Sequence, residues 1–169
     1  RLNLVIFTSC SINGSAGTDK QMTGELQTPY EILGEAGIRA LANAFYDAMQ
    51  ELPEAAEILA MHEEDLDPMR RMLGTYLVGW MGGPPVYLAT KGTVCLNEVH
   101  AHLNLDTRHR DLWLHCMNEA LVRVEASETL VNMLKEPFFH IADTIYRTAA
   151  ENHAPSDRAN DPNIIAVSR

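Results

Sequence analysis

The chain has few cysteines, few aromatic residues and no long apolar run. Cysteine occurs three times in 169 residues, at Cys10, Cys95 and Cys116, and no two of these form a Cys-x-x-Cys pair. This excludes a disulfide framework, so we expect a reducing, cytoplasmic compartment. No stretch approaches the roughly 20 apolar residues that cross a bilayer, so we expect no membrane span.

Positive charge is also scarce. The chain carries 13 basic and 23 acidic side chains, which gives a formal net charge of -10 at pH 7. A field of this sign repels phosphate backbones and anionic lipid, which disfavours nucleic acid and membrane surfaces as partners. The sequence also lacks a Gly-x-Ser-x-Gly motif, a phosphate loop and a dinucleotide fingerprint, so no motif supports hydrolase or nucleotide chemistry.

What the sequence does have is apolar spacing of helical period. With 46% hydrophobic residues over 169 positions, the chain is long enough for one buried core. Strict alternation of apolar and polar residues is hard to find, so we predict an all-α fold. We expect a flexible N-terminal extension over residues 1–28 with Met22 as its candidate natural start, one domain over 29–153, and a flexible tail over 154–169.

Helix-breaking residues divide the domain. We predict a first helix over 29–51 that ends before Pro53, and a short helical piece over 54–60. The next helix should begin with Asp67 as N-cap and Pro68 in its first turn. Gly82-Gly83-Pro84-Pro85 should end it.

The second half of the domain should contain two long helices. Residues 86–106 look irregular, with at most a short helix near 96–102. A helix capped by Asp106 or Thr107 should run to about residue 125. Ser127 should cap the last helix, and Pro137 should kink it.

Seven histidines in an acidic chain raise the question of a metal site. His100 and His102, with Cys95 upstream and His109 downstream, offer zinc ligands, but their spacing matches no standard zinc motif. The alternative is that these histidines are solvated or lie in the core. The acidic run Glu63-Glu64-Asp65 has no catalytic partner in the sequence, and a solvated helix corner accounts for it.

Five blocks of residues occur in an order typical of one family. They are Pro29-Tyr30-Glu31, Phe45-Tyr46, Gly82-Gly83-Pro84-Pro85-x-Tyr87, His100, and Arg110-Asp111-x-Trp113-Leu114-x-Cys116-Met117. In this order they closely resemble group II truncated haemoglobins, a bacterial type within the truncated globin family. The resemblance covers about residues 29–150, and the spacing between the block at Gly82 and the block at Trp113 makes it specific.

The resemblance implies a truncated globin fold, a two-over-two helical sandwich that holds haem b. It places the proximal iron ligand on His100, thirteen residues before Trp113, with His102 as the rival ligand. A single imidazole on the iron leaves the sixth coordination position open to a diatomic gas.

The resemblance also implies a polar distal side formed by Tyr46, His62 and Trp113. Hydrogen-bond donors there oppose the release of a ligand with partial negative charge, each by roughly 1 to 2 kcal/mol. We therefore expect slow release. The remaining haem-pocket residues that the resemblance implies are Phe45, Met69, Leu73, Leu77, Tyr87, Leu103, Met117, Arg70 and Arg71.

Each distal residue has an alternative role. Tyr46 and Trp113 are also suited to the core as aromatic residues with satisfied polar atoms. His62 is also suited to binding the iron itself in the ligand-free state, or to facing solvent beside the acidic run that follows it.

A polar distal side suits oxygen binding and storage, nitric oxide dioxygenation or peroxide-linked redox chemistry. The expected ligands are oxygen, nitric oxide and carbon monoxide. The expected partner is a reductase that the sequence does not identify, and the chain would act as a monomer or a homodimer.

The departures from the family lie on the proximal side. Members usually read Gly-His-Pro-x-x-Arg-x-Arg-His-x-Pro-Phe, whereas residues 92–99 here contain no arginine, and Met72 replaces a basic residue. Haem propionates would then pair with Arg70, Arg71 or Lys91. The alternative function is a globin-fold binding or sensing module that has lost haem.

Overall fold

The computed structural model of the chain describes residues 27–91 and 99–153. Within these two ranges the chain forms helices joined by turns and contains no strand, which confirms the all-α prediction. Most of the expected N-terminal extension and the tail over 154–169 lie outside the described residues. Of the short helix expected near 96–102, residues 96–98 lie outside them, residues 99 and 100 are helical, and residues 101 and 102 form a turn. No helix in the described ranges is long and apolar enough to cross a membrane.

The first helix, α1 (Pro29–Glu51), has the bounds that the sequence predicts. Its start is a capping box, in which Glu31 N donates to Thr28 Oγ1 at 3.2 Å and Thr28 N donates to Glu31 Oε2 at 2.7 Å. One apolar stripe along α1 is buried throughout, and burial of a large side chain stabilises the fold by about 1.5–3 kcal/mol. The stripe consists of Ile38, Leu41, Ala42, Phe45 and Met49.

The predicted helical piece after Pro53 consists of a short 3-10 helix, η1 (Pro53–Ala55), and α2 (Ala56–Leu59). The next helix is α3 (Asp67–Trp80). The prediction that Asp67 caps this helix is wrong, because the N-cap is Leu66 and its side chain makes no capping hydrogen bond. Asp67 N instead donates to Asp65 Oδ1 in the preceding turn, at 3.0 Å.

The predicted stop after α3 is confirmed, and it also joins α3 to the start of α1. Gly82 has a φ of 102°, which only glycine adopts at little cost. Tyr30 N donates to the Met81 carbonyl at 3.1 Å. The Tyr30 ring lies so close to Gly83 that a Cβ at this glycine would sit 2.5 Å from its carbons.

The prediction that residues 86–106 are irregular is wrong at its start, where α4 (Val86–Lys91) forms directly after the two prolines. Proline suits the beginning of a helix because it needs no N–H partner there. The Ala89 N–H donates to the Pro85 carbonyl at 3.1 Å. A helix of six residues is too short to show an apolar stripe in the sequence.

The two long helices of the second half are α6 (Thr107–Arg123) and α7 (Glu128–His153). Asp106 caps α6 as predicted, because its side chain accepts from the N–H groups of Arg108 and His109. Ser127 Oγ accepts from Leu130 N at 3.3 Å, as predicted for the cap of α7. Helix α7 continues through Pro137 as one element, and the kink expected there stays a prediction.

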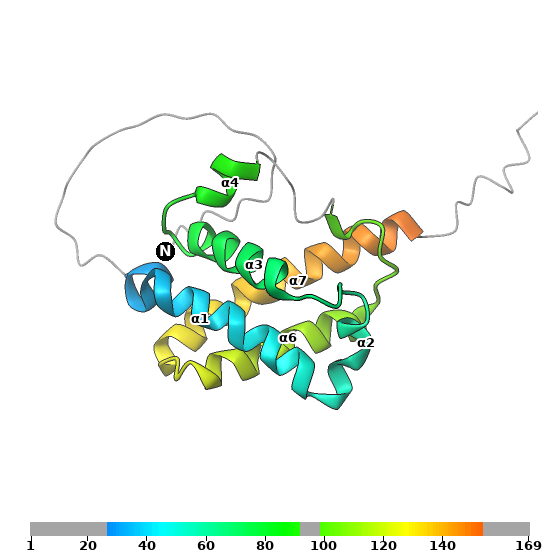
Figure 1. The fold of residues 1–169 in the computed structure, drawn as a ribbon, viewed down its shortest axis with the longest axis horizontal. Helices are drawn as coiled ribbons and strands as arrows, with labels where there is room; N and C mark the ends of the chain where they lie inside the picture. Colours follow the sequence, from blue (N-terminus) through cyan, green and yellow to red (C-terminus); the bar gives the residue numbers. More distant parts are fainter. Residues whose placement is uncertain (1–26, 92–98, 154–169) are drawn as a thin grey trace, which may run out of the picture.

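The helices form two layers (Figure 1). Helix α1 packs on α3 in one direction and on α6 in the other, while α7 packs on α6 and α4 packs on α3. In the described residues, the backbone of α3 does not come close to that of α6 or α7. Aromatic side chains bridge this separation, since the Trp80 ring of α3 stacks on Phe138 of α7 at 5.3 Å. The arrangement is a two-over-two helical fold.

Candidate functional site

The second half of α1 carries two adjacent aromatic residues that are buried together. Phe45 is 1% exposed and Tyr46 is 6% exposed. Their rings meet edge to face, with centroids 5.0 Å apart. Adjacent helical residues point about 100° apart, so the pair faces two neighbours at once.

Burial fixes the protonation state of the Tyr46 hydroxyl. Loss of solvent raises the pKa of this phenol to about 12, although the positive charge of Arg70 acts in the opposite direction. Tyr46 therefore remains a neutral phenol across the physiological pH range. A neutral phenol has an O–H to donate, which is what a ligand with partial negative charge requires.

His62 follows α2 and lies against Tyr46. Its Nδ1 is 2.8 Å from the Ile58 carbonyl oxygen. Because a carbonyl only accepts hydrogen bonds, Nδ1 must carry the hydrogen, and the neutral imidazole then has an acceptor at Nε2. The His62 and Tyr46 rings meet edge to face at 5.6 Å, so the turn after α2 brings a second polar group to the phenol.

Trp113 joins this group from α6. Its ring lies 5.3 Å from that of Phe45 and 6.0 Å from that of Phe138, and the residue is half-buried. The structure therefore brings the three predicted distal residues around one aromatic cluster, with Tyr46 and Trp113 on either side of Phe45. These residues are far apart in the sequence and come from α1, the turn after α2, and α6.

Helix α3, which packs on α1, supplies further apolar side chains. Met69 and Leu73 are half-buried against the core, and Leu77 is fully buried. Tyr87, on α4, is buried and meets Tyr76 edge to face at 5.6 Å. Of these candidate haem-pocket residues, Met69, Leu73 and Leu77 lie on α3 and Tyr87 lies on α4.

A hollow of about 280 Å³ lies between α3 and α4. Its lining residues are Pro68, Arg71, Met72, Thr75, Tyr87 and Thr90. Arg71 is exposed, and among the described residues no carboxylate lies within ion-pair distance of it.

Arg70 has a different environment from its neighbour. Its guanidinium donates to the Asn43 carbonyl at 2.6 Å and to Gln50 Oε1 at 2.8 Å, and it pairs with Asp47 at 2.8 Å. All three partners lie on α1. The structure therefore places the charge of Arg70 on α1, and not toward the hollow between α3 and α4.

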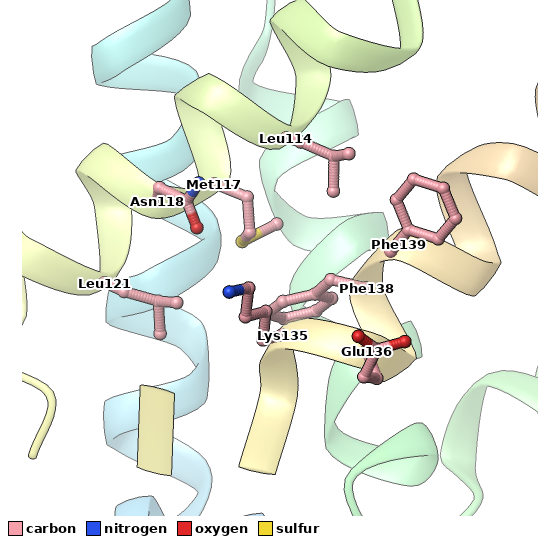
Figure 2. A pocket seen from close by; sticks show the side chains of 8 residues that line it. All are labelled: Leu114, Met117, Asn118, Leu121, Lys135, Glu136, Phe138 and Phe139. Carbon is pink, nitrogen blue, oxygen red and sulfur yellow. The ribbon is translucent and has the colours of Figure 1, made fainter. Parts of the chain in front are cut away.

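Met117 lies one turn after Trp113, on the same face of α6. It is buried and lines a second hollow, of about 170 Å³, between α6 and α7. Figure 2 shows Met117 and Leu114 of α6 facing Phe138 and Phe139 of α7 in this hollow. Met117 therefore supports the packing of Phe138, which in turn contacts Trp113.

The segment that carries His100 is fastened to the end of α7. Leu103 N donates to the His100 carbonyl at 3.0 Å, which closes a turn. Asn152 Nδ2 donates to the Ala101 carbonyl at 3.3 Å, and His153 Nε2 lies 3.1 Å from the His102 carbonyl. Within this segment His100 and Leu103 are half-buried, whereas the rival His102 is exposed.

The described residues contain no group of three or more His, Cys, Asp or Glu residues that could hold a metal ion. Cys95, one of the four candidate zinc ligands, lies outside the described residues. His109 has other partners, with Nδ1 2.7 Å from Asp106 Oδ1 and Nε2 3.3 Å from Glu57 Oε1. This histidine belongs to the cap of α6, and among the described residues its Nε2 has no hydrogen-bond partner. The ion pair between α6 and α2 is that of Arg108 with Glu57, at 3.1 Å.

Sequence reasoning missed two connections that shape the site. One is the ion pair of Glu57 with Arg108 of α6, at 3.1 Å, which joins α6 to α2 one residue before Ile58, the residue whose carbonyl faces His62 Nδ1. The other is the set of Arg70 contacts on α1. A charged residue three or four positions from a partner on its own helix is visible in a sequence, but pairs between separate helices have no such signal.

Comparisons with known proteins agree on one family. The Bacterial-like globin family model matches residues 28–147. The chain is 28% identical over 137 residues to the group 2 truncated hemoglobin YjbI of Bacillus subtilis (strain 168), covering 79% of this chain and 99% of that protein.

Two solved structures extend this likeness to the fold. A cold-adapted truncated hemoglobin from the Antarctic marine bacterium Pseudoalteromonas haloplanktis TAC125 is 38% identical, with a TM-score of 0.67, over 70% of this chain and 97% of that one. A group II 2-on-2 hemoglobin from the plant pathogen Agrobacterium tumefaciens is 34% identical, with a TM-score of 0.67, over 73% of this chain and 97% of that one. The chain belongs to the bacterial-like globin family and, within it, to the group II truncated haemoglobins.

Proposed function

We propose that this chain binds haem b through His100 and holds a diatomic gas, oxygen first among them, with slow release. The observation that carries the proposal is the cluster around Tyr46: a buried neutral phenol with His62 on one side and the Phe45–Trp113 contact on the other. The relatives' names, as haemoglobins, support the same function.

The residues fit a haem group in their chemistry. Met69, Leu73 and Leu77 supply an apolar wall on α3, while His100 supplies an imidazole from a separate segment. The exposed guanidinium of Arg71 can form an ion pair with a propionate. When bound, the haem supplies an iron whose sixth position takes a gas if one imidazole holds the fifth.

The distal side chains have distinct tasks in this function. Tyr46 donates its O–H to the ligand, and Trp113 donates its indole N–H if that group turns toward the same space. When the ligand is absent, we propose that the Tyr46 O–H donates to His62 Nε2, which is an acceptor in the neutral ring whose Nδ1 faces the Ile58 carbonyl. Each donor is worth roughly 1–2 kcal/mol, and every 1.4 kcal/mol slows release about tenfold.

Slow release favours gas storage or redox chemistry over oxygen transport. Donors that retain oxygen also polarise peroxide, so nitric oxide dioxygenation and peroxide-linked oxidation suit the same residues. Either of these reactions needs an electron donor, for which we propose a separate reductase.

Absorption spectra test the haem and its ligand together. The chain is supplied with haem and measured in the ferric state, the ferrous state and the ferrous state with carbon monoxide. We expect a stoichiometric Soret band and a carbon monoxide complex typical of a histidine-ligated globin. The matched variants are His100→Ala, which should lose this complex, and His102→Ala, which should keep it.

Two outcomes would contradict the proposal. Absence of a Soret band in the folded chain would favour the haem-free binding or sensing module, to which the missing arginines of residues 92–99 point. Loss of the complex in His102→Ala but not in His100→Ala would move the iron ligand to the exposed histidine.

A further inference from the structure

The guanidinium of Arg70 is almost fully committed to one face of α1. Its side chain is 16% exposed. Nη1 donates to the Asn43 carbonyl at 2.6 Å and contacts Asp47 Oδ1 at 2.8 Å, while Nη2 donates to Gln50 Oε1 at 2.8 Å. A planar fork with this many fixed partners holds one position and one orientation.

The face of α1 that Arg70 contacts is also the face that carries Tyr46. Asn43, Asp47 and Gln50 are spaced by four and then three residues along α1, which places them in one row on the helix surface. Tyr46 is next to this row, and Arg70 Cζ lies 5.7 Å from the centroid of its ring. This distance is within the range of a cation–π contact.

We propose that Arg70 is a positioning residue, which holds the Tyr46 ring against α3 and strengthens its hydroxyl as a hydrogen-bond donor. Its effect on gas binding rests on the proposed function. Its effect on Tyr46 does not, because the contacts lie wholly within the chain.

The physical reason lies in two opposing effects on the phenol. Burial disfavours the phenolate and so makes the hydroxyl a weaker acid and a weaker donor. A fixed cation beside the ring favours negative charge on the oxygen and partly reverses this, in the direction found for Tyr46. Arg70 thus lets the phenol be buried while it keeps more of its donor strength.

Comparison with Arg71 indicates that the contact of Arg70 with Tyr46 depends on the position of the residue on α3 and not on its charge alone. Arg71 is exposed and lines the hollow between α3 and α4. Arg70 points to α1 and has its donors occupied there. The sequence places both residues together as candidate partners for propionates, whereas the structure gives Arg70 partners that an anion would have to displace.

The test places 3-fluorotyrosine at position 46 in the full chain as purified and follows its 19F NMR signal with pH. The fluorinated phenol is more acidic than tyrosine, which brings its titration into a range where the fold is easier to keep. The variants are Arg70→Met, which removes charge and fork, and Arg70→Lys, which keeps the charge and removes the fork. Far-UV circular dichroism establishes that each variant is folded.

The control is Arg39→Met. Arg39 also joins α1 to α3, since its guanidinium donates to Thr75 Oγ1 at 3.5 Å, and it pairs with Glu35. No ring contact of Arg39 with Tyr46 occurs among the described residues. It therefore reports what the loss of an arginine bridge between these helices does by itself.

We expect Arg70→Met to raise the pKa of the fluorophenol by about one unit, Arg70→Lys to raise it by less, and Arg39→Met to leave it unchanged. An unchanged pKa in folded Arg70→Met, or an equal rise in Arg39→Met, would overturn the proposal. If Arg70→Met does not fold, Arg70→Lys decides: an unchanged pKa of the fluorophenol in folded Arg70→Lys would overturn the proposal.

A second readout links the residue to gas binding. In the haem-loaded chain, Arg70→Lys should speed ligand release about three- to tenfold, the change expected from a weakened hydrogen bond. Unchanged release together with a raised fluorophenol pKa would contradict the link to gas binding. If the chain takes up no haem, the proposed function fails, while the fluorophenol result still decides the role of Arg70 at Tyr46.

Discussion

The Tyr46 ring stands edge-on to the His62 imidazole, with ring centroids 5.6 Å apart. One partner is a phenol that stays protonated, because burial raises its pKa to about 12. The other is an imidazole whose Nδ1 faces the Ile58 carbonyl at 2.8 Å. The pair combines a phenol that donates with a neutral imidazole whose Nε2 accepts.

The first prediction concerns the tautomer of His62. Its Nδ1 must donate to the Ile58 carbonyl, so the neutral ring should carry its proton on Nδ1 and leave Nε2 bare. Two-bond 1H–15N correlation spectra of the neutral ring distinguish the two tautomers. A proton on Nε2 would mean that the ring does not bond to Ile58 in solution. His140 on α7 is exposed and serves as the reference histidine in the same spectra.

The second prediction concerns Tyr46 as donor. In the haem-loaded chain, Tyr46→Phe should speed oxygen release roughly tenfold or more, because one hydrogen bond of about 1–2 kcal/mol is lost. Stopped-flow replacement of oxygen by carbon monoxide measures this rate. Because the pKa of Tyr46 is about 12, release from the parent should show no step from this group between pH 6 and 10. Tyr146→Phe, on α7, is the control, and a tenfold effect there would show that the change is not specific to the cluster.

The third prediction concerns the join between α1 and α3. Gly83→Ala should destabilise the fold by about 1–3 kcal/mol, because its Cβ would lie 2.5 Å from the Tyr30 ring and 2.8 Å from the Val78 carbonyl. Gly74→Ala on α3 is the matched control. Its Cβ would meet Arg39 and Ala42 at 3.5 Å or more, and alanine favours a helix by up to about 1 kcal/mol. Urea unfolding of both variants measures the difference, and equal losses would show that Tyr30 yields to the new methyl group.

The fourth prediction concerns the ion pair between α6 and α7. Arg110 Nη1 donates to Asp143 Oδ1 at 2.9 Å, and both side chains are mostly buried. The hydrogen bond from Arg110 holds the pKa of Asp143 below its usual range, with Arg147 adding to the effect. The stabilisation should be complete above the unfolded pKa of about 3.9 and should be lost as the pH falls through the lower folded value.

Asp143→Asn should therefore cost about 1–3 kcal/mol at pH 7, and the gap between the variant and the parent should narrow at pH 3. Urea unfolding at the two pH values measures it. Asp111→Asn is the control, because Asp111 also contacts Arg110, at 2.8 Å, but its side chain is 62% exposed. A gap that stays constant with pH would show that Asp143 acts through packing and not through its charge.

Local features of the sequence determined most of the helices. The stripe from Ile38 to Met49 repeats with the period of a helix, and Pro53 ends it, so α1 is visible without any partner. The same holds for the stop at Gly82-Gly83-Pro84-Pro85 and for the Asp106 cap of α6. These signals act over a few residues, which is why they can be read along the chain.

The family resemblance added candidates for the site, since the blocks at Tyr46, His100 and Trp113 keep a recognisable order and distance. The resemblance did not indicate toward which element each charged side chain is directed. Arg70 and Arg71 are neighbours with equal claims in the sequence, and their roles differ because adjacent helical positions face directions about 100° apart.

Only the tertiary structure decided the partners of each polar group. The N-cap of α3 is Leu66, which has no capping side chain, because Asp65 Oδ1 in the preceding turn already accepts from the Asp67 N–H. Arg108 pairs with Glu57 because α6 packs on α2. Such contacts join residues many positions apart, and their geometry depends on how whole helices pack, whereas the helical period that the sequence displays depends only on neighbours three and four residues away.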